Sequence, residues 1–504
     1  MYRILTASRD TYITDKIVNS SFRATDANVG QAGTLDLFKL HGETRVSGSV
    51  EEQNEISRIL IKFDLDTLRS MTASMLDPSH SSFKCLLHLS DVYGGQSTPT
   101  NFKVLVLPLS KSFDEGFGRD IGLFQDMDSA NFITASVSSG ISTWAVTGAN
   151  GQGLLGSSNI DVITSGVLTS GVENIGVTQT FREGDEDLLI DVTRIVSATL
   201  AGIIPDHGFR ISFSGSQETD DKTRFVKRFS SRHSSNTRAR PKIRVTFNDT
   251  IHDDHRGMYF DLSGSLFLKN TQRGMPANLM SGSSLTQLTG NNCILLTLIS
   301  GTFSSSFAGS QHRVGNVFVT GMYSASFLMS SLDSAMTGAI RTAGSATFTE
   351  VWSSLDRTIA YVSSSVKILS LQPEVFSDNS KRFFINVFNA KQSYRTIEKA
   401  RFRVFAQDVS VTSDYKYTRG PIESLSYVSR DFFYRIRDVR SGDVIIAFDD
   451  VTNTTNMSTD KDGMYFDVYM DSLEVGRTYT IDIMSKNGGV TEIYETACAP
   501  FRIE

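Results

Sequence analysis

Cysteine, tryptophan and proline are scarce in this 504-residue chain, and the scarcity of cysteine excludes two kinds of stabilisation. The three cysteines lie far apart, each in an apolar context: Cys85, Cys293 and Cys498. They match neither a disulfide framework nor the paired spacing of a zinc site. We therefore expect reduced, buried thiols, as in a protein made in a reducing cytosol.

Long hydrophobic runs are also missing. The most apolar segments, residues 104–109 and 293–299, have the length of a strand and fall well short of the ~18 apolar residues of a membrane-spanning helix. The N-terminal residues MYRIL lack the longer apolar core and small-residue cleavage site of a signal peptide. We expect neither membrane insertion nor an export signal.

Charge of one sign is not in excess, because 49 Lys and Arg face 55 Asp and Glu and the net charge is −6. That balance excludes a globally basic nucleic-acid or membrane-surface binder. The content of 39% hydrophobic and 21% charged residues is ordinary for folded proteins, so disorder is not the main state. With 33 Phe against 9 Pro, and with abundant Ser, Thr and Gly, the composition favours many short strands over helix bundles.

Alternation of apolar and polar residues is the dominant pattern along the chain. In RILIKFDL, residues 58–65, the apolar residues Ile59, Ile61 and Phe63 face one way and Arg58 the other, which predicts a half-buried strand. The same alternation predicts strands at residues 83–89, 209–213 and 242–247. Helical periods are few, and they predict only two short helices, over residues 65–76 and 192–200, the second with Asp191 as N-cap.

Composition and length divide the chain into three expected domains, residues 1–250, 251–370 and 371–504. From about 270 to 370 charges become sparse, and spaced aromatics among Ser, Thr, Gly and Ala favour a small β-sandwich. Beyond residue 371 charge returns with strands at 384–388, 401–405, 433–448, 463–470 and 478–484, and with turns at Ser441-Gly442 and Asp462-Gly463. The pentapeptide GMYFD occurs twice, at 257–261 and 463–467, which we interpret as a coincidence of strand composition.

An ordered series of segments in residues 1–248 resembles the DNRLRE-type jelly-roll module, which is related to carbohydrate-binding domains and occurs in cell-surface proteins and virion proteins of tailed phages. The matching segments are ASRDTYITD (7–15), ANVGQAGTLDLF (27–38), SRILIKFDLDTL (57–68), FKCLLHLSDV (83–92), SFDEGFGRD (112–120) before Trp144, LLIDVTRIV (188–196), HGFRISFSG (207–215) and FSSRHSSNTRARPKIRVTF (229–247). In the last segment Arg232 and His233 stand where such modules commonly carry an acidic residue. The second half, with residues 320–327 and VWSSLDRT at 351–358, looks like the immunoglobulin-like domains of large-phage virion proteins.

Several clusters of polar residues are candidate chemical sites. His252-Asp253-Asp254-His255 is competent to bind a divalent metal, but we interpret it as a solvated hinge at a domain boundary. The run Glu183, Asp185, Glu186 and Asp187 could offer carboxylates to calcium or to glycoside cleavage, and a solvated loop is the simpler interpretation. Asp460 and Asp462 lack the spacing of a calcium loop and predict a turn. No GxSxG, HExxH or P-loop motif is present, and no GxGxxG opens a helix, so we expect no enzyme, no metal and no cofactor.

The strongest electrostatic feature is a basic run without an intervening acid. It comprises Lys222, Arg224, Lys227, Arg228, Arg232, Arg238, Arg240, Lys242 and Arg244. Such a patch suits a neighbouring subunit or an anionic polysaccharide, and a plain solvated face is an equally good interpretation. Its Phe225 and Phe229 fall on inward positions, which argues against nucleic-acid binding by stacking.

The sequence therefore predicts an all-β chain, a jelly-roll sandwich followed by two smaller immunoglobulin-like sandwiches. The resemblance implies a non-enzymatic virion structural protein of a tailed bacteriophage, a tail, collar, fibre or head-decoration component made in the host cytoplasm. Expected partners are other virion proteins and further copies of this chain, with host surface polysaccharide as a possible ligand. The alternative is a carbohydrate-binding adhesin or receptor-binding module, for which Trp144 and Trp352 would supply the larger stacking platforms.

Overall fold

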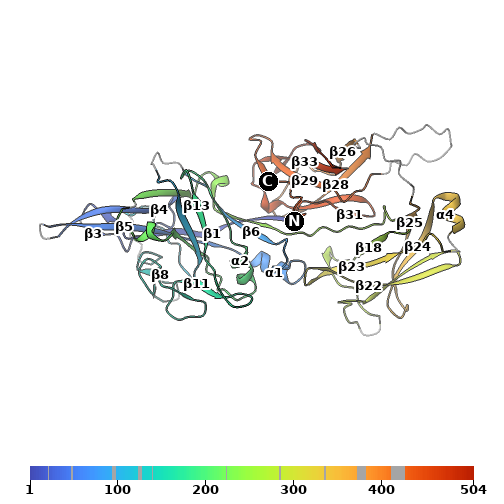
Figure 1. Cartoon of the computed structure of the whole chain (residues 1–504), viewed down its shortest axis with the longest axis horizontal. Coiled ribbons are helices and arrows are strands. Elements are labelled where there is room, and N and C mark those ends of the chain that lie inside the picture. The colour runs from blue at the N-terminus through green and yellow to red at the C-terminus, as the bar shows by residue number, and fades with distance from the viewer. Residues whose placement is uncertain are drawn as a thin grey trace. The chain divides into compact units, whose positions relative to one another are not determined.

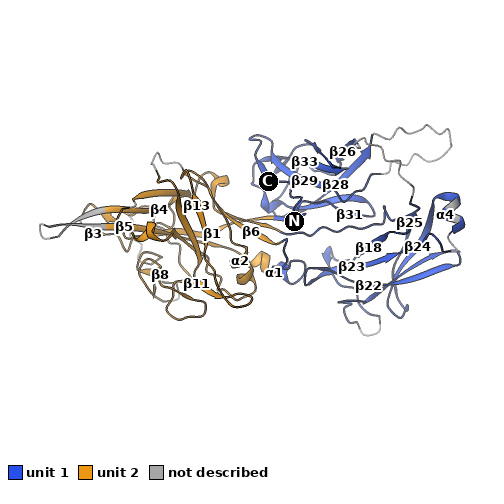
Figure 2. Ribbon diagram, viewed as in Figure 1, with its two compact units in different colours: residues 1–2, 71–82, 247–504 blue, residues 3–70, 83–246 orange. Residues whose placement is uncertain are grey.

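The computed structural model describes residues 1–20, 22–46, 49–92, 98–122, 128–138, 140–222, 224–282, 285–333, 337–371, 382–409, 426–487 and 489–504; within residues 42–53 and at 339 and 341 it describes the main chain alone. The regular secondary structure of the described chain is mainly β-strand, with a few short helices, as predicted (Figure 1). It divides into two compact units (Figure 2). Unit 1 comprises Met1–Tyr2, Met71–Ser82 and Phe247–Glu504, and unit 2 comprises Arg3–Ser70 and Phe83–Thr246. None of the helices in these ranges has the length and apolarity that a membrane crossing requires.

Unit 2 contains a ten-stranded sheet that folds over on itself into a jelly-roll sandwich. The strands follow the order β13 (Val177–Phe181), β7 (Phe102–Pro108), β15 (Phe209–Phe213), β5 (Ser49–Phe63), β1 (Tyr2–Thr14), β17 (Lys242–Thr246), β6 (Lys84–Leu89) and β14 (Leu188–Asp191), with β4 (Thr34–Val46) paired to β5 and β16 (Phe225–Ser230) paired to β4. Phe102 of β7 and Phe213 of β15 contact Phe225 of β16, with ring centroids 4.8 and 4.4 Å apart. These rings form a core between the two layers.

Strand β5 is buried on both faces, which the alternation did not predict. Ile59 and Ile61 face the core as expected, but Arg58 on the opposite face is only 3% exposed. Its guanidinium donates to the Gly148 carbonyl at 2.7 Å and to the Glu218 carboxylate at 2.7 Å. The outer face is covered by a second, smaller core that includes Leu60, Leu107, Phe113, Ala130, Trp144 and Ala149. Arg58 is therefore a buried structural residue, and the expectation of a half-buried strand is wrong at this point.

In unit 1, the middle part of the chain forms a second sandwich. Six strands follow the order β18 (Ser263–Lys269), β23 (Val317–Leu328), β22 (Phe303–Val314), β21 (Ile294–Ser300), β24 (Ser345–Ser353) and β25 (Ala360–Leu369). The first half of β22 pairs with β21 and its second half with β23, so this strand links the two layers. Their shared core includes Trp352 and Tyr323, both fully buried. The Ser-rich and Thr-rich composition of this region thus accompanies an ordered core.

The C-terminal part of unit 1 is a third sandwich. One layer has the order β26 (Phe383–Val387), β28 (Lys399–Asp408), β32 (Gly463–Tyr469) and β31 (Ser458–Asp460), and the other has β27 (Ser393–Tyr394), β35 (Phe501–Ile503), β33 (Thr478–Asn487), β29 (Phe432–Asp438) and β30 (Val444–Ile446), with β34 (Val490–Tyr494) also paired to β33. Aromatic pairs join the layers: Phe402 contacts Phe501 at 5.5 Å, and Tyr434 stacks on Phe466 at 4.1 Å.

Both predicted helices are present, but the predicted cap is wrong. Helix α1 spans Asp66–Thr72 and α2 spans Thr193–Leu200. The N-cap of α2 is Val192, which makes no side-chain capping bond. Asp191 precedes the N-cap and is still part of strand β14, and its carboxylate accepts the Thr193 N–H at 2.8 Å.

The short elements outside the large sheets are β2 (Ile17–Val18), β3 (Phe22–Arg23), β8 (Thr134–Ser136), β9 (Ser142–Thr143), β10 (Gln152–Leu154), β11 (Val162–Val167), β12 (Val172–Asn174), β19 (Thr271–Gln272), β20 (Met275–Pro276), α3 (Ser216–Thr219) and α4 (Thr337–Ala343).

One further expectation needs correction. The GMYFD copy at 463–467 opens β32, whereas the copy at 257–261 lies in a turn where Asp261 has a φ of 64°, so the two copies do not share strand structure. The segment Met71–Ser82, inside the predicted first domain, belongs to unit 1, where Asp77 accepts the Asn316 N–H at 2.7 Å. Residues 372–381, next to the second predicted boundary, lie outside the described residues. The three cysteines are free thiols and buried, as expected.

Candidate functional site

The nine residues of the predicted basic patch have different surroundings. Two are exposed in the loop before β16, namely Lys222 and Arg224. Six are partly buried, and several of these contact an acid or a main-chain carbonyl, among them Arg228 (with Asp36), Arg232 (with Glu115), Arg240 (with the Ser234 carbonyl) and Lys242 (with the Arg238 carbonyl). Arg238 and Arg244 complete the partly buried set. Only part of the run therefore projects its charge toward solvent, and docking through it stays a prediction.

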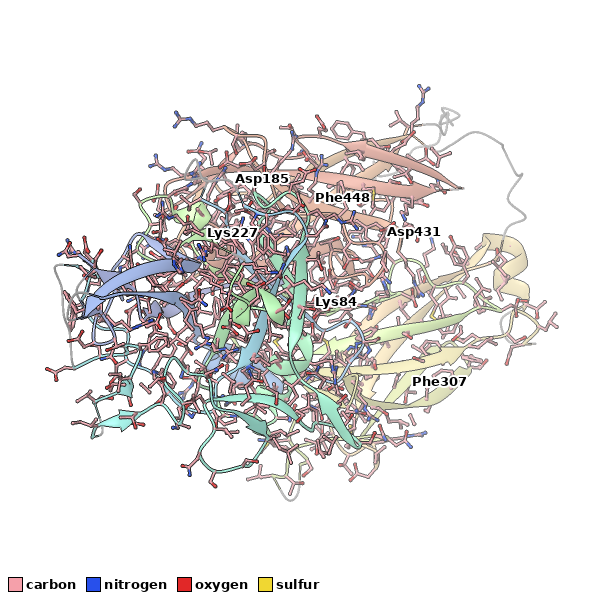
Figure 3. All side chains as sticks on the ribbon, turned by 60° about the vertical axis from the view of Figure 1, so that its left-hand side comes forward. Lys84, Asp185, Lys227, Phe307, Asp431 and Phe448 are labelled. Carbon is pink, nitrogen blue, oxygen red and sulfur yellow. The ribbon has the colours of Figure 1, made fainter. Side chains whose placement is uncertain are left out.

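Lys227, the ninth, points into the protein. Its side chain is 1% exposed, shares the inward face of β16 with Phe225 and Phe229, and pairs with Asp91. The ammonium group donates to the carbonyls of Gly184 and Glu186 at 2.7 and 2.9 Å, on either side of Asp185 (Figure 3). It also lies 5.1 and 5.3 Å from the ring centroids of Phe181 and Phe229. Lys227 is an internal cation and is not available to a partner.

The acidic run beside it stabilises its own loop. The Glu186 carboxylate accepts the N–H groups of Arg182, Glu183 and Gly184 at 2.6–3.0 Å. Burial works against ionisation of this carboxyl, but the main-chain donors outweigh it and lower its pKa to about 2. Asp187 bonds to His88 at 2.8 Å. These contacts agree with the structural interpretation of the run and leave Glu183 and Asp185 exposed.

The HDDH segment is not the solvated hinge that we expected. Asp253 is buried and His255 is half-buried, and their side chains bond to each other. The other ring nitrogen of His255 lies 3.0 Å from the Glu350 carboxylate on β24. The half-buried imidazole and the two acids on either side of it form a structural ion network.

Four residues from three separate segments of unit 2 meet in one charged cluster, which we call the Asp10 cluster: Asp10, Glu115, Arg232 and His233. Asp10 lies on β1, Glu115 follows β7, and Arg232 and His233 follow β16. The Arg232 side chain donates to both oxygens of Glu115, and its main-chain N–H donates to Asp10 Oδ2 at 2.6 Å. His233 Nε2 lies 3.4 Å from Glu115 Oε1.

Asp10 is the unusual member of the cluster. It is fully buried, and its Oδ1 atom has no hydrogen-bond partner among the described residues. Burial is the main cause that raises the pKa of this carboxyl, to about 7; the Arg232 N–H opposes the rise and the Glu115 charge adds to it. The cluster thus holds two carboxylates, one imidazole and one guanidinium around an unsatisfied oxygen. Such a set is suited to holding a proton or a cation.

Asn28 fixes the position of Glu115. Its amide nitrogen donates to the carbonyls of Glu115 and Ala130, both at 2.8 Å, and its oxygen accepts the N–H groups of Gly30 and Gly118 at 3.1 and 3.0 Å. The two loops approach so closely that a Cβ on Gly30 would lie 1.9 Å from the Glu115 carbonyl oxygen. A side chain cannot be accommodated there.

Replacement of Asn28 by Ala is expected to destabilise unit 2 by about 3 kcal/mol, because it leaves two buried donors and two acceptors without partners. The measurement is urea unfolding of the full chain followed by circular dichroism. Asn236→Ala is the control, since that amide accepts one N–H, from Arg238, in an exposed loop. Equal effects of the two substitutions would contradict a special role for Asn28.

Sequence reasoning missed Asp10 and Glu115 as a site. Both lie in segments that carry the jelly-roll resemblance, ASRDTYITD and SFDEGFGRD, and Arg232 and His233 lie in a third. The signal was present as three short polar segments. Nothing in their spacing, over more than 200 residues, indicated that they meet.

Both tryptophans are buried. Trp144 is 5% exposed and donates its indole N–H to the Asn131 carbonyl at 2.9 Å, and Trp352 is fully buried with its indole bonded to Glu350. Neither ring has an open face on which a sugar could stack. The platforms expected for the adhesin alternative are therefore not available at these two residues.

Comparison with known proteins adds little to this geometry. No family model matches the chain, and no curated protein matches it. Among solved structures, the Ig1-2 module of the Drosophila receptor protein tyrosine phosphatase DLAR is similar over 48% of this chain and 90% of its own, with 10% identity and a TM-score of 0.14. A titin fragment matches 51% of this chain and 96% of its own at 8% identity and a TM-score of 0.14. Scores this low carry no argument, so the all-β assignment depends on the sheets themselves.

Proposed function

We propose that this chain is a non-enzymatic structural protein of a tailed-phage virion, which docks on the particle through its β-domains. Two features support the proposal. Three β-sandwiches follow one another along the chain. The side chains of the acidic run, of the HDDH segment and of Lys227 are largely engaged in internal ion pairs and hydrogen bonds. A scaffold of this kind suits a role in presenting surfaces.

The observation that carries the proposal is a two-stranded arm formed by the outer parts of β4 and β5. Pairing of β4 with β16 ends at Lys39, and pairing of β5 with β1 ends at Ser57. Between Leu40↔Glu55 and Val46↔Ser49 these strands pair only with each other among the described strands. Figure 1 shows the hairpin, in blue, continuing beyond the other strands of unit 2. A hairpin of this type offers two free edges for strand addition by a neighbouring subunit.

The exposed basic residues lie beside the base of this arm. The loop before β16 is joined to it by Asn54, which donates to Asp221 at 3.0 Å, and by Lys39, which pairs with Asp220 at 2.9 Å. Lys222 and Arg224 extend from the same loop into solvent. Strand pairing by the arm and attraction of an acidic neighbour by the loop would act on one surface.

The test is incorporation of the chain into virions of the phage that encodes it. Wild-type protein is expected in purified virions, located by immunogold labelling. A variant in which residues 42–53 are replaced by an Asn-Gly turn is expected at about tenfold fewer copies per virion, which corresponds to ~1.4 kcal/mol of lost contact. Both proteins should unfold at the same urea concentration, because the replaced residues pair only within the hairpin.

Absence of the wild-type chain from purified virions would refute the structural role. Normal incorporation of the shortened variant would refute docking through the arm alone. If the chain is absent from virions but binds host surface polysaccharide on a glycan array, the adhesin alternative is favoured.

A further inference from the structure

We propose that the Asp10 cluster is a binding site for one divalent transition-metal ion of the zinc class, with Asp10, Glu115 and His233 as ligands. This inference does not depend on a role in a virion. It begins with the arrangement of donor atoms: one ligand atom from each of the three residues lies within 4.8 Å of the other two. The three residues come from segments far apart in the sequence. Asn28, which bonds to Gly30 and Gly118, also bonds to the Glu115 main chain and so holds Glu115 in place.

The second observation is independent of the clustering. Asp10 is fully buried, its Oδ2 is satisfied by the Arg232 N–H, and its Oδ1 has no partner among the described residues. A buried carboxylate oxygen without a donor is costly, and it is rare in folded proteins. A cation bound to Oδ1 removes that cost.

The spacing of the other two ligands also suits a metal. His233 Nε2 and Glu115 Oε1 are 3.4 Å apart, which is long for a charge-assisted hydrogen bond. Two ligands of a tetrahedral zinc ion, each ~2.1 Å from the metal, are separated by about 3.4 Å. The pair is therefore placed as neighbouring vertices of a coordination shell, with water as the expected fourth ligand.

Arg232 acts as an outer partner of the bound carboxylate. Its guanidinium contacts both Glu115 oxygens and orients them, as second-shell donors do around metal ligands. With Asp10 and Glu115 ionised and Arg232 charged, the cluster carries one net negative charge before metal binding. A bound divalent cation changes this net charge to one positive charge. The positive charge of Arg232 is therefore compatible with metal binding at this cluster.

The ligand types select the class of metal. An imidazole nitrogen with two carboxylates suits zinc, cobalt, nickel or manganese, whereas calcium and magnesium prefer shells made of oxygen alone.

The test uses the full-length chain without a histidine tag, stripped with EDTA and exchanged into metal-free buffer at about pH 8. Calorimetric titration with Zn²⁺ is expected to give one ion per chain with a Kd of about 1 μM or tighter. Titration with Co²⁺ is expected to give the strong visible absorption of a four-coordinate ion. His233→Ala and Asp10→Asn should each weaken Zn²⁺ binding by about 100-fold or more, since even outer-shell substitutions cost about 10-fold to 100-fold.

His207→Ala is the matched control, because His207 is a partly buried histidine of the same unit outside the cluster. It should leave the Kd unchanged. His233 is only partly buried, so circular dichroism of His233→Ala should match the wild type and separate loss of a ligand from loss of fold. Absence of Zn²⁺ and Co²⁺ binding below about 1 mM, or full retention of binding in both ligand variants, would overturn the proposal. Tighter binding of Ca²⁺ than of Zn²⁺ would overturn the assignment to the zinc class.

Discussion

Glu350→Ala is expected to destabilise the middle sandwich by about 3–5 kcal/mol, because it breaks a buried ion network at its centre. Glu350 is 1% exposed and accepts bonds from Ser364 at 2.9 Å, from His255 at 3.0 Å and from the Trp352 indole. Removing it leaves the imidazolium of His255 with Asp253 alone and two further donors without a partner. Urea unfolding followed by Trp352 fluorescence, in a Trp144→Phe background, measures the loss.

The same network predicts a dependence of stability on pH. Burial works against the charged imidazole, but hydrogen bonds to Asp253 and Glu350 outweigh it and raise the pKa of His255 from 6.5 to about 10. The folded state therefore keeps a proton that the unfolded chain releases. The stabilisation is complete below about pH 6.5 and is lost as the pH rises through 10. In Glu350→Ala the fall in unfolding free energy between pH 7 and 10 should be smaller.

Asp356→Ala is the control for this network. Asp356 is an exposed carboxylate in the turn between β24 and β25 that bonds only to side chains and N–H groups of its own turn. Its removal should change the unfolding free energy far less than Glu350→Ala. An equal loss in the two variants, or a wild-type stability that is flat up to pH 10.5, would contradict the network as described.

Lys227→Ala is expected to destabilise unit 2 by about 3–5 kcal/mol. The substitution leaves the Asp91 carboxylate and the carbonyls of Gly184 and Glu186 without their cation, inside a cage that includes Phe181 and Phe229. The measurement is chemical denaturation followed by circular dichroism at about pH 7. Far less loss is expected from Lys222→Ala, an exposed member of the same basic run, which should stay within about 0.5 kcal/mol.

The comparison of these two lysines also bears on docking. If the basic run is a docking surface, Lys222→Ala should weaken association with the docking partner while the fold is retained. Lys227→Ala should weaken that association only to the extent that it unfolds unit 2. A Lys227→Ala protein with wild-type stability would show that the ammonium group is not held in the interior. The loop charges and the arm are the appropriate targets for docking experiments.

Some properties of this protein follow from the sequence alone. Alternation located strands β15, β17 and β33 at residues 209–213, 242–246 and 478–487, because apolar side chains at every second position of each strand face a core. β15 is buried on both faces, like β5, so the expectation of a half-buried strand is wrong there as well. The turn at Ser441-Gly442 was also predictable, since Gly442 adopts a φ of 75° that suits glycine. These features are local, and local physics decides them.

Other properties were decided only when the chain folded. Alternation placed Lys227 on the same face as Phe225 and Phe229, but whether that face meets solvent or a compensating acid depends on Asp91, which is 136 residues away. Arg58 is buried because a second core covers the outer face of β5, which no period in β5 itself records. His255 and Glu350, and likewise Asp10, Glu115 and His233, are brought together by strand order. Sequence patterns report which face of a strand a residue occupies. The topology determines what that face contacts. For a buried charge, the partner supplied by the topology decides whether the residue stabilises the fold or forms a site.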